Sequence, residues 1–396
     1  MHNYNILFIT SHPVNSTASS SIRNKNLITG FLQKKIGITL ICPESDGDYL
    51  DIFNDISNIE FKTYKLNPRL KQIKDRNDPS KPSLLTLLIK SALKIYRKFS
   101  ILKMAGQSLK YTDNIEIDGA HFDLVITSSD PIASHLFFKK IMHRISYNKW
   151  CQYWGDPLAY DITNTTLIPK FYRKYFEFNI LKEADTIVYV SPFTLKLQSD
   201  IYPKLKEKMY FIPPASQAEV LYKNVENDER ILISYTGGYN SIVRDIMPLY
   251  KALSNSSNKN IKLIISGPTD VILESNENII INDTVSLSQV REIEKESDLI
   301  VIIMNKIGTQ IPSKLYYTAS TNKDILVLIN NENDSLSKYL KQFNRYDLCL
   351  NNEDAILNYL KNLTKTKLGH REPMLSLLPE NVADNFLTIN NILLQF

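Results

Sequence analysis

Two basic residues in the second half of the chain lie in sequence patterns that are typical of phosphate-binding sites. Lys314 follows Pro312 in the first turn of a predicted helix, and the apolar run 299–304 predicts a buried strand before it. A helix start offers free N–H groups and partial positive charge, and a lysine adds a mobile cation. This strand–loop–helix–strand stretch therefore indicates an anion site. The alternative is a βαβ unit with a solvated lysine.

The second side chain is Arg244. It follows Gly237 and Gly238, which end the predicted strand 231–235 and precede a predicted helix. A strand, a Gly-Gly turn and a helix allow the backbone to approach a phosphate closely. The fork of a guanidinium group matches phosphate oxygens. We therefore expect a second phosphate contact at this turn.

A serine-rich loop near the N-terminus is a third candidate. The pattern predicts a strand at 5–10, a helix at 21–35 and a strand at 38–42. Small residues let backbone N–H groups approach a diphosphate, and hydroxyls can donate as well. The alternative is a flexible loop with a helix cap, and no G-x-G-x-x-G supports dinucleotide binding. The residues predicted to contact a diphosphate are Ser19, Ser20, Ser21 and Arg23.

A carboxylate and an aromatic residue follow one another at the end of a further predicted strand. Asp156 and Trp154 lie in the stretch 150–157, and open α/β sheets place ligands at the carboxyl ends of their strands. Because aromatic faces stack on sugar rings, we predict a sugar site here. The alternative is that Asp156 caps a turn and Trp154 is a core residue.

Length and composition limit the class of protein. With 396 residues and 43% hydrophobic content, the chain can form two domains with separate cores. Its three cysteines are far apart without metal spacing, so we expect buried thiols in a reducing compartment and no metal site. No run reaches the roughly 18 apolar residues of a membrane span. We expect a cytoplasmic protein without a signal peptide.

Positive charge is concentrated in the first half. Residues 1–212 hold 29 basic against 20 acidic residues, which suggests an anionic partner but does not argue for nucleic acid. Residues 62–110 hold thirteen basic and two acidic residues, and 84–99 predicts an amphipathic helix. That helix either lies in an anionic membrane interface or packs on its own domain. Its basic residues are Lys90, Lys94, Arg97 and Lys98.

Alternating strands and helices predict an α/β protein of two Rossmann-like domains facing a cleft. We place the first domain at 1–212, a polar linker at 213–229 and the second domain at 230–375. A helix is expected within the final segment, 376–396.

The order of these motifs resembles that of GT-B fold glycosyltransferases similar to glycosyltransferase family 4. Residues 311–316, I-P-S-K-L-Y, resemble the family's I-P-x-K-hydrophobic-aromatic element, and 235–249 resemble its Y-x-G and R-D-x-x-P-L pattern. Residues 185–191 are similar to its A-D-x-I-x-x-V-S segment. The chain departs from the family at Tyr317 and Thr309, where glutamates are usual.

The resemblance implies a retaining transfer from a nucleotide-diphosphate sugar to a glycan or lipid-linked acceptor, without cofactor or metal. It implies that the last helix crosses back to the first domain. It also implies bacterial capsule or lipopolysaccharide synthesis and peripheral contact with an anionic inner membrane through 62–110. The catalytic residues would be Asp156, Arg244 and Lys314. The donor-binding residues would be Gly237, Gly238, Thr309, Gln310, Ile311, Pro312, Ser313, Tyr317 and Val285.

Two other classes stay open. A sugar-nucleotide epimerase of the same fold would need additional acid and base side chains, and the chain has only six histidines. A non-catalytic sugar-nucleotide-binding subunit is compatible with tyrosine at 317, since the ribose-binding glutamate of the family is absent there.

Overall fold

The computed structural model covers residues 1–396. The residues that the structure describes are 4–44, 52–53, 57–66, 91–93, 95–96, 98–162, 166–217, 221–222, 230–369 and 371–392. The chain divides into two compact units, which we call unit 1 (Met1–Pro213 with Pro379–Phe396) and unit 2 (Pro214–Leu378). Each unit is described separately below.

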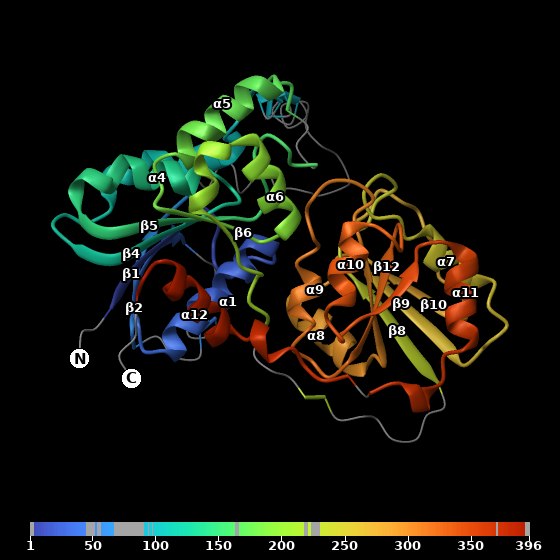
Figure 1. Cartoon of the computed structure of the whole chain (residues 1–396). Helices are drawn as coiled ribbons and strands as arrows, with labels where there is room; N and C mark the ends of the chain where they lie inside the picture. The colour runs from blue at the N-terminus through green and yellow to red at the C-terminus, as the bar shows by residue number, and fades with distance from the viewer. Residues whose placement is uncertain are drawn as a thin grey trace. The chain divides into compact units, whose positions relative to one another are not determined.

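Unit 1 contains a parallel sheet in the order β3-β2-β1-β4-β5-β6-β7 (Figure 1). Most of its strands are runs of apolar residues, as expected where helices cover both faces of a parallel sheet. The strands are β1 (Asn5–Thr10), β2 (Gly37–Pro43), β3 (Ile59–Tyr64), β4 (His121–Ser128), β5 (Ser146–Trp154), β6 (Thr186–Tyr189) and β7 (Met209–Phe211).

Helices cover both faces of this sheet. Helices α1 and α12 lie on one face, and α4, α5 and α6 lie on the other (Figure 1). The helices are α1 (Ser19–Gln33), α4 (Ala133–Ile141), α5 (Lys170–Leu181), α6 (Pro192–Ile201) and α12 (Pro379–Ile389). The shorter 3-10 helices are η1 (Lys103–Lys110), η2 (Thr112–Asn114), η3 (Met142–Arg144) and η4 (Pro203–Lys208).

The last helix of the chain packs in unit 1. Phe386 of α12 meets Phe31 of α1 edge to face, with ring centroids 6.4 Å apart. Gly30 permits this approach, because a Cβ there would collide with the backbone carbonyl of Pro379. Asn390 accepts a 2.7 Å hydrogen bond from the hydroxyl of Thr186.

Unit 2 contains a second parallel sheet in the order β10-β9-β8-β11-β12-β13. Helices α7 and α11 pack on one face of it, and α8, α9 and α10 lie on the other (Figure 1). The strands are β8 (Ile231–Thr236), β9 (Ile261–Ser266), β10 (Ile279–Asn282), β11 (Leu299–Ile303), β12 (Asp324–Ile329) and β13 (Asp347–Leu350). The helices are α7 (Met247–Ser254), α8 (Leu287–Glu296), α9 (Lys314–Tyr317), α10 (Ser335–Lys341) and α11 (Glu353–Lys361), with 3-10 turns η5 (Lys365–Lys367) and η6 (Leu375–Leu377).

Both sheets reverse their direction of growth at one place. In unit 1 the chain builds outward from β1 through β2 and β3, then returns to the other side of β1 with β4. In unit 2 it builds from β8 to β10 and returns beside β8 with β11. Open α/β sheets bind ligands outside the carboxyl ends of the strands at such a switch point. The predicted pair of Rossmann-like domains is therefore confirmed, and each has a switch point.

Three local predictions need correction. The sequence pattern of 132–146 predicts one helix, but α4 ends at Ile141 and a strand begins at Ser146, since Ser146, Tyr147 and the following residues pair with β4. The Gly237–Gly238 turn leads into a loop, and α7 begins only at Met247. The helix expected around Pro312 begins at Lys314 and has four residues, so its N-terminus gives little support to an anion site.

Much of the predicted basic segment 62–110 lies outside the described residues. These include Lys90, Lys94 and Arg97 and most of the helix predicted at 84–99. In the part that is described, residues 91–93, 95–96 and 98–99 are helical. No helix among the described residues is both long enough and apolar enough to cross a membrane.

Candidate functional site

The two cations singled out from the sequence meet at the end of β8 in unit 2. Lys314 Nζ donates a 2.7 Å hydrogen bond to the carbonyl of Thr236, the last residue of β8. Arg244 Nη1 donates to the carbonyl of Gly238, at 3.4 Å. Gly237 lies between these two carbonyls. The cations therefore lie at the switch point of β8 and β11 although they are 70 positions apart in the sequence.

Arg244 is held by neutral groups. Its Nε donates to Asn305 Oδ1 at 2.7 Å, and Asn305 Nδ2 donates to the carbonyl of Gln310 at 2.9 Å. Arg244 thus joins the loop after β8 to the loop after β11. Among the residues that the structure describes, no carboxylate forms an ion pair with Arg244. Its positive charge therefore remains available to an anionic ligand.

Lys314, by contrast, already has a carboxylate partner. Glu294 Oε1 lies 2.6 Å from Lys314 Nζ and also accepts a 3.2 Å hydrogen bond from the hydroxyl of Thr236. The carboxylate is near the end of α8, and Glu294 is 8% exposed. The Lys314–Glu294 pair is therefore formally neutral and fixes the lysine against β8.

Sequence reasoning missed Glu294, although its spacing gave a signal. It follows Leu287 by seven positions and Val290 by four, so it lies on the helix face that carries these apolar residues. A carboxylate on the inward face of a helix needs a partner, because burying an unpaired charge is costly. Lys314 supplies that partner.

The other predicted donor-binding residues occupy the surrounding loops. Ile311, Pro312 and Tyr317 are buried, with Tyr317 at 9% exposure, and Thr309, Gln310 and Ser313 are partly exposed. Val285 is partly exposed in the loop after β10. Asn282 of β10 donates to the hydroxyl of Ser266 in β9, and the carbonyl of Ser266 accepts from Gly237 N. These contacts connect the carboxyl ends of β10, β9 and β8.

The turn after β8 is packed tightly against the turn after β9. Gly267 has φ +146°, and a Cβ at this position would collide with the carbonyl of Gly237. At Gly238 the nearest atom to an added Cβ is 3.5 Å away, so close packing does not require glycine there. Gly237 N donates its hydrogen bond to the carbonyl of Ser266, so this N–H is already used within the protein.

Unit 1 has a polar cluster of its own at the β1–β4 switch point. Arg23 of α1 is buried, and its Nη2 donates to Ser128 Oγ at 3.1 Å. Ser128 Oγ donates to Asn24 Oδ1 at 2.6 Å, and Asn24 Nδ2 donates to the hydroxyl of Thr10 at 3.1 Å. The guanidinium also lies 4.6 Å from the ring centroid of Tyr153. These bonds hold α1 against the strand ends.

The carboxyl group of Asp130 lies beside this arginine, and the backbone of Asp156 contacts it. Asp156 N donates to Asp130 Oδ2 at 3.2 Å. Burial, and next the charge of Asp156, raise the pKa of Asp130 well above its usual range, while Arg23 opposes the rise. Asp130 was not among the predicted site residues. Its position just after a buried strand, in Ser-Ser-Asp-Pro, was the available signal.

The four residues of the predicted diphosphate loop differ in position. Ser19 is exposed at the start of α1 and Ser20 is partly exposed. Ser21 is buried, and its hydroxyl donates to the carbonyl of Pro13 at 2.8 Å. Arg23 points into the cluster with Ser128 and Tyr153. Whether any of the four contacts a diphosphate stays a prediction.

The sugar-stacking role expected of Trp154 is not supported, because this side chain is fully buried. Its ring lies 4.6 Å from that of His135, and its Nε1 donates to Gln152 Oε1 at 3.1 Å. Burial lowers the pKa of His135 to about 3, so that ring is neutral. Trp154 is a core residue, which was the alternative interpretation.

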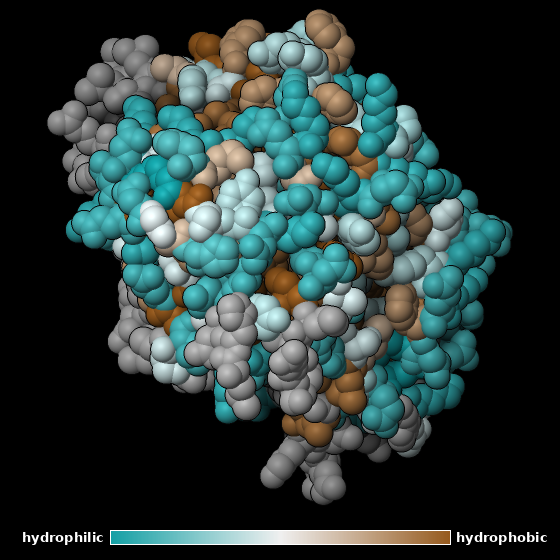
Figure 2. Space-filling model, turned by 60° about the vertical axis from the view of Figure 1, so that its left-hand side comes forward, coloured by the Kyte–Doolittle hydropathy of each residue, from teal (hydrophilic) through white to brown (hydrophobic). Residues whose placement is uncertain are grey.

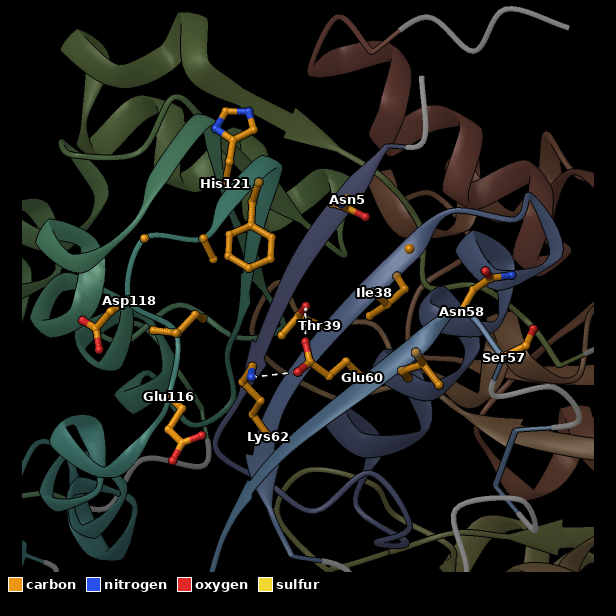
Figure 3. Close-up of a pocket in the computed structure, with 16 residues that line it drawn as sticks. Asn5, Ile38, Thr39, Ser57, Asn58, Glu60, Lys62, Glu116, Asp118 and His121 are labelled. Atoms are coloured by element: carbon orange, nitrogen blue, oxygen red, sulfur yellow. Dashed lines mark hydrogen bonds and ion pairs between the residues drawn. The ribbon is translucent and has the colours of Figure 1, made fainter. Parts of the chain in front are cut away.

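A separate hollow of about 900 Å³ lies at the opposite edge of the unit 1 sheet, where β1 to β4 begin (Figure 3). Glu60 Oε1 and Lys62 Nζ form an ion pair of 2.8 Å at its wall, and Thr39 donates to Glu60 at 3.3 Å. Because α/β sheets place ligands at the carboxyl ends of strands, we assign no function to this hollow. In the described ranges of the chain, no three His, Cys, Asp or Glu side chains are grouped to hold a metal ion.

Comparison with known proteins gives the fold. No protein-family model matches the chain, and no curated protein matches it. Among solved structures, TarM aligns with a TM-score of 0.56 and 8% identity, over 99% of this chain and 97% of that one. The lipopolysaccharide outer core galactosyltransferase WaaB aligns with a TM-score of 0.51 and 12% identity, over 97% and 98%.

An epimerase has a similar structure. The UDP-GlcNAc 2-epimerase from Neisseria meningitidis, in a structure bound to UDP-GlcNAc, aligns with a TM-score of 0.50 and 10% identity over 98% of both chains. At identities this low, the alignments show a shared architecture and do not show a shared function. The chain thus has the GT-B fold, which glycosyltransferases and this epimerase share.

Proposed function

We propose that this protein is a glycosyltransferase that binds a nucleotide-diphosphate sugar at the end of β8 in unit 2. The observation that carries the proposal is the position of Arg244. Its partners in the described part of the chain are neutral, and it lies at the β8–β11 switch point beside Lys314. A diphosphate there would accept hydrogen bonds from a guanidinium that no described carboxylate neutralises.

Departure of the diphosphate is the step that these cations would assist. When the bond between the sugar and the diphosphate breaks, negative charge accumulates on the leaving phosphate oxygens. Arg244 supplies a fixed positive charge at that point. Lys314 can contribute a second hydrogen bond, while Glu294 holds its ammonium group in place. Membership in glycosyltransferase family 4 and a retaining outcome are part of this proposal.

The acceptor side is proposed for unit 1. Asp156 and Asp130 lie at the carboxyl edge of its sheet, where a hydroxyl of a glycan or lipid-linked acceptor would bind. Arg23 stabilises negative charge on Asp130. A role in the cytoplasmic synthesis of a bacterial capsule or lipopolysaccharide is the pathway class that we propose.

A sugar-nucleotide epimerase is the second candidate, and one observation favours it. The backbone N–H of Asp156 donates to the carboxyl of Asp130, and burial together with the charge of Asp156 raises the pKa of Asp130, so a proton can be held there near neutral pH. Epimerisation requires such a group to remove or return a proton at the sugar.

One experiment separates these functions. The protein is incubated with UDP-, GDP- and TDP-sugars, with and without polysaccharide or lipid-linked acceptors, and the products are identified by mass spectrometry. Transfer, or slow release of the nucleoside diphosphate, supports a glycosyltransferase. An isomeric nucleotide sugar supports an epimerase. If the protein binds a nucleotide sugar and forms neither product, the result supports a non-catalytic subunit.

The same incubation needs matched variants. Arg244→Ala should abolish the products, whereas Lys251→Ala, which removes an exposed lysine of α7, should leave them unchanged. If both variants behave like the wild type, the assignment of the donor site to the end of β8 is wrong.

A further inference from the structure

Three positive charges at the carboxyl end of the unit 2 sheet have different partners. The stretches 237–246 and 304–314, which follow β8 and β11, contain three basic residues, which are Arg244, Lys306 and Lys314. Lys306 Nζ lies 2.9 Å from Asp245 Oδ2, and Lys314 Nζ lies 2.6 Å from Glu294 Oε1. Arg244 Nε instead donates a 2.7 Å hydrogen bond to the carboxamide oxygen of Asn305. Carboxylates thus neutralise the two lysines, whereas a neutral side chain holds the arginine.

Asn305 is buried, although asparagine is mostly a surface residue. Figure 2 shows hydrophilic residues over much of the face that it displays, as is normal for a protein surface. Asn305, the second residue after β11, is only 9% exposed. A buried carboxamide needs hydrogen-bond partners for its oxygen and for its nitrogen, because leaving either one unpaired costs free energy. The partners of Asn305 therefore show what its side chain is placed to hold.

The two partners of this side chain require a carboxamide. Its Oδ1 accepts from Arg244 Nε, and its Nδ2 donates to the carbonyl of Gln310 at 2.9 Å. An aspartate has the same shape, but it could only accept, and it has no donor for the carbonyl of Gln310. Asn305 thus joins Arg244 to the loop that contains the predicted donor-binding residues 309–313.

The backbone of Asn305 is also held in place. Its carbonyl accepts a 2.9 Å hydrogen bond from Nδ2 of Asn330, the residue after β12. The next N–H group, that of Lys306, donates to the carbonyl of Val243 at 2.8 Å, directly before Arg244 in the sequence. The carboxamide therefore holds the guanidinium group from a fixed position.

We propose that Asn305 is a positioning residue of the donor site, which fixes the guanidinium group of Arg244 without neutralising its charge. The inference rests on the proposed function, in which Arg244 binds the diphosphate of a nucleotide sugar. Because a diphosphate carries several negative charges, its attraction to the site depends on the net charge around Arg244. A carboxylate at position 305 would occupy the guanidinium fork that a phosphate needs.

The test replaces the carboxamide by a carboxylate of the same size. Calorimetry identifies which of UDP, GDP and TDP binds the wild type, and the same nucleotide is then titrated into Asn305→Asp. We expect an affinity at least about tenfold lower, because Arg244 then forms an ion pair within the protein. The monophosphate of the same base should lose a smaller factor, since it carries less charge.

Asn258→Asp is the matched control. Asn258 is exposed in the loop before β9, at the opposite edge of the sheet. Its Oδ1 accepts a 3.0 Å hydrogen bond from Asn260 N, which an aspartate keeps. This variant adds the same charge to unit 2 and should bind nucleotide like the wild type.

A double-mutant cycle separates positioning from a purely structural role. Asn305→Ala should lower the affinity for the same diphosphate about three- to tenfold, because the guanidinium group is then no longer held. In the Arg244→Ala background it should have no further effect, because it acts only through the arginine. A loss of the same size in both backgrounds would mean that Asn305 only shapes its loop, and would overturn the proposal.

Melting temperatures without nucleotide check the fold and the contact. Asn305→Asp should melt near the wild type, because Arg244 faces the new carboxylate. Arg244→Ala/Asn305→Asp should melt well below either single variant, since it buries a carboxylate without a cation. If the double variant melts like the single variants, the two side chains are not in contact and the proposal is wrong.

Failure of this inference can be told apart from failure of the proposed function. If the wild type binds a nucleoside diphosphate and Asn305→Asp binds it equally well, the positioning role is wrong and the donor site is unaffected. If the wild type binds none of the three nucleotides, the proposed donor function is wrong, and the positioning role is refuted with it.

Discussion

Glu177→Gln should change how the stability of unit 1 depends on pH. Glu177 lies on α5 and is fully buried. Its Oε1 accepts a 2.6 Å hydrogen bond from Leu158 N, and its Oε2 accepts a 2.8 Å hydrogen bond from the hydroxyl of Tyr202. Glu177 thereby anchors the loop that carries Asp156. Burial raises the pKa of Glu177 from 4.5 to about 7, and its hydrogen bonds only partly oppose the rise.

The direction of the pH dependence follows from the state, folded or unfolded, in which Glu177 holds the proton. Between pH 4.5 and about 7 the folded protein holds a proton on Glu177 that the unfolded chain has lost. The free energy of unfolding therefore falls as pH rises through this window and levels off above it. At 1.36 kcal/mol per pKa unit, the full loss is about 3 kcal/mol.

Glutamine removes this titration and keeps the contacts. Its Oε1 still accepts from Leu158 N, and its Nε2 can donate to the oxygen of Tyr202. The hydroxyl proton of Tyr202 can then be donated to the carbonyl of Lys174, which lies 3.1 Å away. We expect Glu177→Gln to match the wild type near pH 4.5 and to exceed it by up to about 3 kcal/mol near pH 8.

Urea denaturation followed by tryptophan fluorescence measures this difference. Both tryptophans of the chain, Trp150 and Trp154, are buried in unit 1, so the signal reports that unit. Comparing variant with wild type at each pH cancels the contribution of Asp130. Glu207→Gln, an exposed glutamate on η4, is the control and should show no pH-dependent difference. A difference between Glu177→Gln and the wild type that is constant from pH 4.5 to 8 would refute the reasoning.

The remaining predictions concern unit 2 and α12. The Lys314→Ala variant should melt at a lower temperature than the wild type, because Glu294 is left buried without a cation. The double variant Lys314→Ala/Glu294→Gln should restore the melting temperature but not the affinity for nucleotide. Equal melting temperatures of the two variants contradict this. Tyr317→Ala should weaken nucleotide binding by about 1 kcal/mol in calorimetry. If the affinity is unchanged, Tyr317 is not a nucleotide-binding residue. Gly30→Val should lower the stability of unit 1 by about 1–3 kcal/mol in denaturation, because its side chain collides with the carbonyl of Pro379, and an unchanged stability rejects this packing.

The strands were the most predictable part of the fold. A run such as 299–304 is apolar at every position, which only a doubly covered strand or a buried helix explains. The boundaries of helices were less predictable. Residues 142–146 have no strong stop signal, and the pairing of Ser146 and Tyr147 with β4 ends the helical region there. Such long-range pairing overrides local propensity.

The site was predictable only in part, for a similar reason. Sequence spacing identified Arg244 and Lys314 separately, but only the order of the strands shows that they meet at β8. Trp154 alternates with Tyr153 at a strand end, and the sequence did not determine whether it faced a ligand or the core. The sequence did not indicate Asp130 as a site residue, because its pKa shift arises from burial and from Asp156, which is 26 positions away.

Calorimetric titration of the wild type and of Arg244→Ala with UDP, GDP and TDP tests the proposed donor site at the end of β8. We expect the wild type to bind at least one of these nucleotides. Arg244→Ala, folded by circular dichroism, should lose about 1.5–3 kcal/mol of binding free energy, the range for a hydrogen bond to a charged group. Lys251→Ala should bind like the wild type. If the wild type binds none of the three, or if Arg244→Ala binds equally well, the donor site is not at the end of β8.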